Sequence, residues 1–131
     1  MCVFCKIISG EFSSHKIYED DKVLAILDLS QATVGHTLVM PKAHLENIFE
    51  LDNDTAKHLF GVVTKICNHY KEVIPNLAGI NLLNNNGERA GQTVMHYHMH
   101  IIPRYNDDDL VNMQFTEHKL DLKAICDNLK I

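Results

Sequence analysis

Three histidines alternate with other residues in the segment His96-Tyr97-His98-Met99-His100, and this segment is the part of the 131-residue chain best suited to chemistry. Side chains alternate faces along a β-strand, so the pattern predicts a strand with the three imidazoles on one side and Tyr97 and Met99 facing the core. Imidazole titrates near neutral pH and can attack an electrophile or carry a proton. The spacing therefore predicts a chemically active strand face.

Three explanations of this histidine face are open. The first is a solvated strand that happens to be rich in histidine. The second is one metal ion bound by all three imidazoles. At ~3.3 Å per residue, however, the outer Cα atoms lie roughly 13 Å apart, which bonds of ~2.0–2.1 Å cannot span without bending the strand. The third is a division of labour, in which one histidine is nucleophile or base and its neighbours orient it or handle protons. We favour the third.

The loop that precedes the predicted strand, from Asn85 to Thr93, is polar and carries two glycines. Gly87 and Gly91 permit tight turns and let backbone amides approach a ligand closely. Asn85, Gln92 and Thr93 add neutral hydrogen-bond donors. Taken alone, such a loop is usually just a turn. Beside the histidines, it is predicted to hold a phosphate or ribose.

Cys2 and Cys5 have the Cys-x-x-Cys spacing that lets two thiolates bind one zinc ion. A redox pair is an alternative, but no thioredoxin-like βαβ pattern follows these residues. A closed tetrahedral zinc site needs two more ligands. Two reduced cysteines without metal are the third interpretation.

Composition restricts the class of protein. The formal net charge is -5 and no cluster of lysine or arginine occurs, which argues against a nucleic-acid partner. The N-terminus lacks the layout of a signal peptide, and no apolar run approaches the ~20 residues of a membrane helix. We therefore expect a cytoplasmic protein with no membrane partner. The length and the 46% hydrophobic content suit a single domain over residues 1–131.

The elements that position these residues are predicted to form an α+β fold, with an antiparallel sheet of about five strands, one main helix and a C-terminal helix. The main helix starts at Asp54, with Asp52 or Asp54 as its cap, and Pro75 closes it. Its apolar residues recur at helical spacing: Leu59, Val63, Ile66 and Tyr70. The other predictions are a short helix over 2–9, a hairpin of 15–19 and 22–27, strands over 36–40, 79–83 and 93–102, an acidic loop over 106–109 and a helix over 117–130.

The motifs together resemble the histidine-triad (HIT) superfamily. The segment from His96 to Ile102 matches the family signature His-x-His-x-His followed by apolar residues. Further segments look like family segments and occur in the family's order: Phe4 and Ile7, Leu24-Ala25-Ile26-Leu27-Asp28, Gly35-His36-Thr37-Leu38-Val39-Met40-Pro41-Lys42-Ala43-His44, and Gly91-Gln92-Thr93. The resemblance covers roughly residues 2–105 and is closest to the purine-nucleotide-binding hydrolases and their small bacterial-type relatives. Residues 106–131 diverge from it.

This resemblance implies a homodimer and an enzyme that cleaves a bond at the α-phosphate of a nucleoside phosphoramidate or a related adenylated compound. His98 would be the nucleophile and form a covalent nucleotidyl–histidine intermediate, and His100 would contact the phosphate and assist proton transfer. Gln92 and Thr93 would hold phosphate oxygens or the leaving group, where charge develops. The alternatives are a dinucleoside polyphosphate hydrolase and a non-catalytic, zinc-stabilised nucleotide-binding module.

The resemblance also implies the remaining site residues. Asp28 would bind the ribose hydroxyls of a purine nucleotide, and Asn85, in the same loop as Gly91, would lie near the phosphate or ribose. An apolar slot for the base would be formed by Phe4, Ile7, Ile26 and Leu29. Some family members with the cysteine pair complete a structural zinc site with two histidines, which correspond here to His44 and His96. His36 receives no role.

Overall fold

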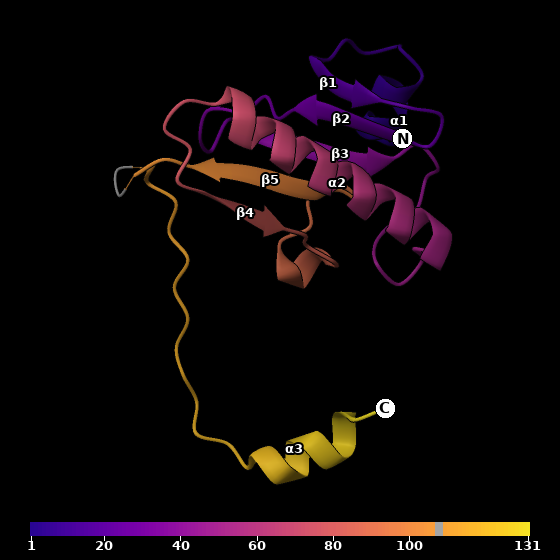
Figure 1. The fold of residues 1–131 in the computed structure, drawn as a ribbon. Helices are drawn as coiled ribbons and strands as arrows, with labels where there is room; N and C mark the ends of the chain where they lie inside the picture. The colour runs from indigo at the N-terminus through magenta and orange to yellow at the C-terminus, as the bar shows by residue number, and fades with distance from the viewer. Residues whose placement is uncertain (107–108) are drawn as a thin grey trace.

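The computed structural model describes residues 1–106 and 109–131, and it has one five-stranded antiparallel sheet with helices on both faces (Figure 1). Along the chain the elements are α1 (Val3–Ile8), β1 (Lys16–Glu19), β2 (Val23–Leu27), β3 (Thr37–Pro41), α2 (Asn53–Val73), β4 (Gly79–Leu83), the 3-10 turn η1 (Glu88–Ala90), β5 (Met99–Arg104) and α3 (Leu122–Leu129). The strand order is β1-β2-β3-β5-β4. The predicted α+β class and the number of strands are confirmed.

Helix α2 covers one face of the sheet and supplies most of the core. Asp52 caps it, because its carboxylate accepts a hydrogen bond from the Thr55 amide at 2.8 Å. The apolar stripe of an amphipathic helix faces its sheet. The buried residues of this core are Val23, Ala25, Val39, Leu59, Val62, Val63, Ile66, Tyr70, Tyr97 and Ile101.

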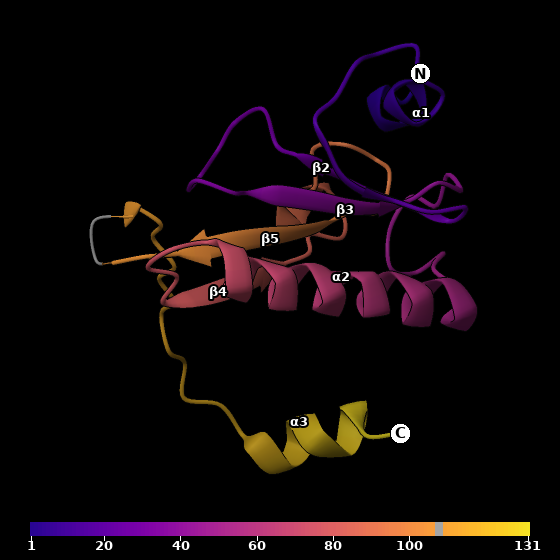
Figure 2. The ribbon, with the colours of Figure 1, turned by 45° about the horizontal axis from the view of Figure 1, so that its top comes forward.

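Helix α1 lies on the opposite face of the sheet from α2, as Figure 2 shows. Phe4 anchors it in a second, smaller core with alternate residues of β2 and β3, namely Leu24, Ile26, Leu38 and Met40. The register of the sheet pairs Leu38 with His100, so His100 lies on this same face. The small helix therefore brings the N-terminal cysteines to the face that carries the histidines.

The predicted strand over 93–102 is wrong at its start, because β5 begins only at Met99. The ladder with β3 starts at the pair of Val39 and Met99. Before that point the chain is held elsewhere, since the Tyr97 amide donates to the carbonyl of Leu45 at 2.7 Å. His96 and His98 thus lie on an irregular approach to the strand. Tyr97 and Met99 still face the α2 core, as the alternation predicts.

The C-terminal segment differs most from expectation. The predicted helix over 117–130 is shorter and spans Leu122–Leu129, with Asp121 as its cap. Residues 107 and 108 of the predicted acidic loop lie outside the described residues. Residues 110–131, which we call the C-terminal arm, extend past the β4 side of the sheet and away from the rest of the chain (Figures 1 and 2). Within the described residues, no helix is long and apolar enough to cross a membrane.

Candidate active site and metal centre

His98 is buried, and one of its ring nitrogens makes a hydrogen bond to the backbone. Its Nδ1 lies 2.7 Å from the carbonyl oxygen of His96, and a carbonyl can only accept, so Nδ1 carries the hydrogen. Neutral His98 therefore holds its lone pair on Nε2. Burial lowers the pKa of His98, which favours this neutral form. The Phe4 ring packs edge-on against it at 5.0 Å between centroids. The arrangement presents a neutral imidazole oriented for attack through Nε2.

His100 pairs with another histidine, because its Nδ1 lies 2.9 Å from Nε2 of His36. The Ala32 amide donates to Nδ1 of His36 at 3.1 Å, so that nitrogen is the acceptor and His36 donates from Nε2. The Ser30 carbonyl, 3.2 Å from the same Nδ1, suits the opposite tautomer, but the amide of Ala32 cannot accept. His100 then carries its own hydrogen on Nε2 and can donate it to a substrate.

Burial is the main reason that the pKa of His100 falls to about 4, and repulsion from His98 and His36 lowers it further. A histidine with this pKa is neutral at physiological pH. With Nδ1 accepting from His36, a neutral His100 is a hydrogen-bond donor through Nε2. It is thus suited to contact a phosphate oxygen or a leaving group.

His36 is the site residue that sequence reasoning missed. It is buried, and its Nε2 also lies 3.5 Å from a carboxylate oxygen of Asp28. We call Asp28, His36, His98 and His100 the reactive cluster. The sequence feature that points to His36 is its position as a polar residue directly before β3, the strand that pairs with β5.

The four residues proposed for zinc also come together, and we call Cys2, Cys5, His44 and His96 the cysteine–histidine cluster. Nδ1 of His44 lies 3.3 Å from Nδ1 of His96 and 3.3 Å from Sγ of Cys5. Nδ1 of His96 lies 3.5 Å from Sγ of Cys2 and 3.6 Å from Sγ of Cys5. Tetrahedral zinc, with bonds of ~2.0–2.1 Å to nitrogen and ~2.3 Å to sulfur, separates its ligand atoms by about 3.3–3.8 Å. The four side chains fit that geometry.

The surroundings of His96 prepare it to be a ligand. Its Nε2 lies 2.7 Å from the carbonyl oxygen of Pro41 and donates to it, which leaves Nδ1 for a metal. The side chain is fully buried. Cys2 caps α1 and Cys5 follows one turn later, so the helix places both sulfurs on the same side.

The loop before the histidines is held together by Gln92. Its buried amide donates to the carbonyls of Glu46 and Val94 at 2.6 and 3.0 Å and accepts from the Gly87 amide at 2.8 Å. This side chain therefore shapes the loop. Gly91 has a φ of +94°, in the left-handed region that suits glycine.

The other residues predicted for the loop and for the base slot differ in exposure. The side-chain amide of Asn85 donates to the Gly91 carbonyl at 3.4 Å, and Thr93 is exposed. Phe4 and Ile26 are buried in one cluster, and Ile7 packs against them. Leu29 is 90% exposed and lies outside this cluster.

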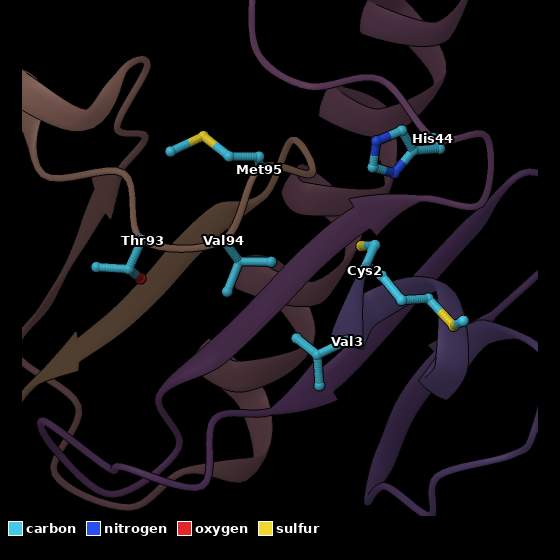
Figure 3. A pocket seen from close by; sticks show the side chains of 7 residues that line it. Cys2, Val3, His44, Thr93, Val94 and Met95 are labelled. Atoms are coloured by element: carbon cyan, nitrogen blue, oxygen red, sulfur yellow. The ribbon is translucent and has the colours of Figure 1, made fainter.

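A cavity of about 390 Å³ opens beside the cysteine–histidine cluster (Figure 3). Cys2 and His44 line it on the cluster side, and Thr93 and Met95 line it from the loop before β5. Asp28 and Phe4 do not line this cavity. The predicted ribose and base contacts therefore lie apart from it.

The chain belongs to the HIT family, since the HIT domain matches residues 9–107. "Protein hit" of Bacillus subtilis is 52% identical over 122 residues, covering 93% of this chain and 83% of the relative. The crystal structure of a HIT family protein from Bacillus anthracis is 49% identical and covers 97% of this chain and 91% of its own, with a TM-score of 0.90.

Two further relatives carry informative names. One is the adenosine 5'-monophosphoramidase hnt1 of Schizosaccharomyces pombe, 37% identical over 82% of this chain and 77% of its own length. The other is a zinc-bound histidine triad family protein from Mycobacterium smegmatis, 38% identical over 88% of this chain and 84% of that one, with a TM-score of 0.80.

Proposed function

We propose that this protein is a nucleotide hydrolase that cleaves a bond at the α-phosphate of a nucleoside phosphoramidate or a related adenylated compound. The observation that carries the proposal is the pair of hydrogen bonds that give His98 a free lone pair on Nε2 and His100 a hydrogen on Nε2. A nucleophile and a hydrogen-bond donor thus lie on neighbouring rings, 5.0 Å apart between centroids. The phosphoramidase name of the fission yeast relative agrees with this chemistry.

In the first step, Nε2 of His98 attacks the α-phosphorus and the bond from phosphorus to the leaving nitrogen breaks. The leaving amine takes a proton from a water molecule, which becomes hydroxide, while neutral His100 donates a hydrogen bond from Nε2 to a phosphate oxygen. The His96 carbonyl stabilises the positive charge on the His98 ring, because it accepts the hydrogen of Nδ1. The product of this step is a nucleotide joined covalently to His98.

In the second step, the hydroxide left by the first step attacks the phosphorus of this intermediate. The bond from phosphorus to Nε2 breaks, and a nucleoside monophosphate leaves. His100 keeps its hydrogen on Nε2 through both steps and donates it as a hydrogen bond to the phosphate. Asp28 is proposed to bind the ribose hydroxyls, Phe4, Ile7 and Ile26 the base, and Asn85, Gly91 and Thr93 the phosphate or its leaving group. Gln92 is proposed to support that loop.

We further propose that the cysteine–histidine cluster holds one structural zinc ion. The support is the ligand spacing, which matches a closed tetrahedral site of two thiolates and two imidazoles. The zinc-bound Mycobacterium relative agrees with it. With all four positions filled by protein, this site has no role in polarising a substrate. It ties α1 to the segment that carries His98.

The test is steady-state release of AMP from adenosine 5′-phosphoramidate by the wild type, His98→Ala and a matched control, His69→Ala. His69 is an exposed histidine on α2. We expect the His98 variant to lose at least about 10³-fold in kcat, as removal of a nucleophile does, and to keep nucleotide binding. The control is expected to match the wild type.

Turnover by His98→Ala at the wild-type rate would overturn the proposal. If the wild type releases no AMP from the phosphoramidate, dinucleoside polyphosphates are the next substrates to test. If neither class is hydrolysed and AMP still binds, the protein is a nucleotide-binding module and not an enzyme of this class.

A further inference from the structure

The side-chain amides of Asn84 and Asn86 form a chain of hydrogen bonds that ends on the backbone of His98. The backbone amide of Ile48 donates to Oδ1 of Asn86 at 2.7 Å, and Nδ2 of Asn86 donates to Oδ1 of Asn84 at 2.6 Å. Nδ2 of Asn84 then donates to the carbonyl oxygen of His98 at 2.9 Å. Both asparagines are half-buried. We call Asn84 and Asn86 the asparagine relay.

The direction of the asparagine relay is fixed at both ends. A backbone amide can only donate and a backbone carbonyl can only accept, so Ile48 sets the first bond and His98 the last. Between them, each side-chain amide has one orientation that satisfies both of its neighbours. A reversed Asn84 would turn its oxygen toward the His98 carbonyl, and two acceptors repel each other. Asn86 therefore sets the orientation of Asn84, and Asn84 acts on His98.

The backbone of His98 needs this support because it lies just outside the ladders of the sheet. Strand β5 starts at Met99, where its pairing with β3 begins, and its pairing with β4 begins at His100. The hydrogen bonds of a ladder fix the course of a strand, and His98 comes one residue before the first of these pairs. Asn84 directly follows β4, so its side chain supplies a donor beyond the last pair of that ladder.

The backbone around His98 also sets the direction of its ring. Nδ1 of His98 donates to the carbonyl of His96, so the direction of Nε2 depends on the peptide groups between these two residues. The peptide group that carries this carbonyl also carries the Tyr97 amide, which donates to the carbonyl of Leu45 at 2.7 Å. The peptide group that follows His98 is held by Asn84. With both peptide groups fixed, the imidazole of His98 has a defined direction.

We propose that Asn84 and Asn86 are positioning residues for His98, which act through its backbone and keep Nε2 directed at the α-phosphate. The chemical part of this inference rests on the proposed hydrolysis, whereas the positioning of the ring is a property of the fold. Asn85, between the two, takes no part in the asparagine relay, since its amide donates to the Gly91 carbonyl at 3.4 Å. The three consecutive asparagines therefore serve two tasks, with Asn85 left for the phosphate or ribose.

The test compares Asn84→Ala, Asn86→Ala and the double variant with a matched control, Asn68→Ala. Asn68 is an exposed residue of α2 whose side-chain amide also donates to a backbone carbonyl, that of Thr64 at 3.0 Å. A misplacement of about 1 Å can cost roughly 10²-fold in rate, so we expect kcat for AMP release to fall roughly 10–100-fold in Asn84→Ala. The loss in Asn86→Ala should be smaller, because Asn84 is still present. KM should stay at the wild-type value in both, and the control should match the wild type.

The double variant distinguishes a relay from two independent structural roles. If Asn86 acts only through Asn84, its removal has no further effect once Asn84 is gone, and the double variant should have the kcat of Asn84→Ala. Losses that multiply would overturn the relay. Circular dichroism shows whether each variant is folded, and Asn86→Ala, which leaves the His98 carbonyl its donor, is compared with the control alone if Asn84→Ala does not fold.

A second measurement reports on the ring without any substrate. The His98 and Phe4 rings are in edge contact at 5.0 Å between centroids, so their protons should show a nuclear Overhauser effect in the wild type and in the control. We expect this effect to weaken in Asn84→Ala. An unchanged ring contact, or wild-type kcat, in this variant would overturn the inference and leave the hydrolysis standing. If the wild type has no turnover, the proposed function fails, and the ring contact still decides whether Asn84 positions His98.

Discussion

The cysteine–histidine cluster and the reactive cluster lie at opposite ends of the same five-residue segment, yet their imidazoles are arranged for different tasks. In the cysteine–histidine cluster the ligand atoms of all four residues lie within 4.8 Å of one another, and in the reactive cluster those of Asp28, His36 and His100 do. His96 donates to a backbone carbonyl and turns Nδ1 toward two sulfurs. His100 accepts from another imidazole and keeps its hydrogen on Nε2. The hydrogen-bond partner of each ring, more than the ring itself, sets its chemistry.

The residues around these imidazoles increase the chemical difference between the two clusters. Two thiolates with two imidazoles are a preferred zinc set. In the reactive cluster, the lone pair on Nδ1 of His100 already accepts from His36 at 2.9 Å. His98, the member of the reactive cluster next to His96 along the segment, takes its orientation from the His96 carbonyl. One end of the segment can therefore be fixed by a metal while the other end stays available for a substrate.

Removal of one thiolate should have the largest effect, and this effect should fall on the cysteine–histidine cluster. In Cys5→Ala we expect zinc to fall from one ion per chain to near zero and the Tm to drop by on the order of 5–10 °C, because metal binding stabilises the folded state. Metal analysis and thermal unfolding measure the two effects. Cys126→Ala, which removes an exposed cysteine in the arm, should change neither. Wild-type zinc content in the Cys5 variant would exclude the proposed ligand set.

Loss of the His36 hydrogen bond should act on the other cluster alone. His36→Leu leaves Nδ1 of His100 without a donor, so the tautomer with hydrogen on Nε2 is no longer favoured. We expect kcat to fall roughly 10–100-fold, with little change in KM or zinc content. In His36→Gln the side-chain amide can still donate, and this variant should recover part of the loss.

His58→Asn is a suitable control for the His36 variants, since His58 pairs with Asp20 outside both clusters, at 2.7 Å. Its kcat should equal that of the wild type. Equal activity of His36→Leu and the wild type would show that His36 does not position His100. Equal losses in the Leu and Gln variants would indicate a packing role instead of a hydrogen bond.

The elements of the fold followed from the sequence because each depends on local periodicity. The helical spacing of Leu59, Val63 and Ile66 predicted α2, and the alternation around Tyr97 predicted which side chains enter the core. The zinc ligand set came from the family resemblance, and the structure brings these four residues together. Periodicity could not locate the start of β5, because that start depends on a hydrogen bond to Leu45, 52 positions earlier.

The contacts that the sequence could not reveal join side chains from separate elements. The bond between His36 and His100 depends on the register of β3 and β5, which places residues 64 positions apart side by side. The orientation of Gln92 depends on the backbone course of its loop, since its partners include a carbonyl 46 positions away. A list of polar residues near the histidines could name Gln92 but could not show that its amide supports the loop.

The pH dependence of stability should show the smallest effect, and it tests the protonation of His100 in the reactive cluster. The pKa of His100 is lowered to about 4 by burial, whereas an unfolded histidine titrates near 6.5. Between these values the unfolded chain binds a proton that folded His100 does not, so this residue lowers stability as the pH falls below about 6.5. We expect the Tm of His100→Gln to decrease less than that of the wild type between pH 7 and pH 5. Thermal unfolding at both values measures this difference. Parallel decreases in the two proteins would mean that His100 titrates normally in the folded state and that burial does not hold it neutral.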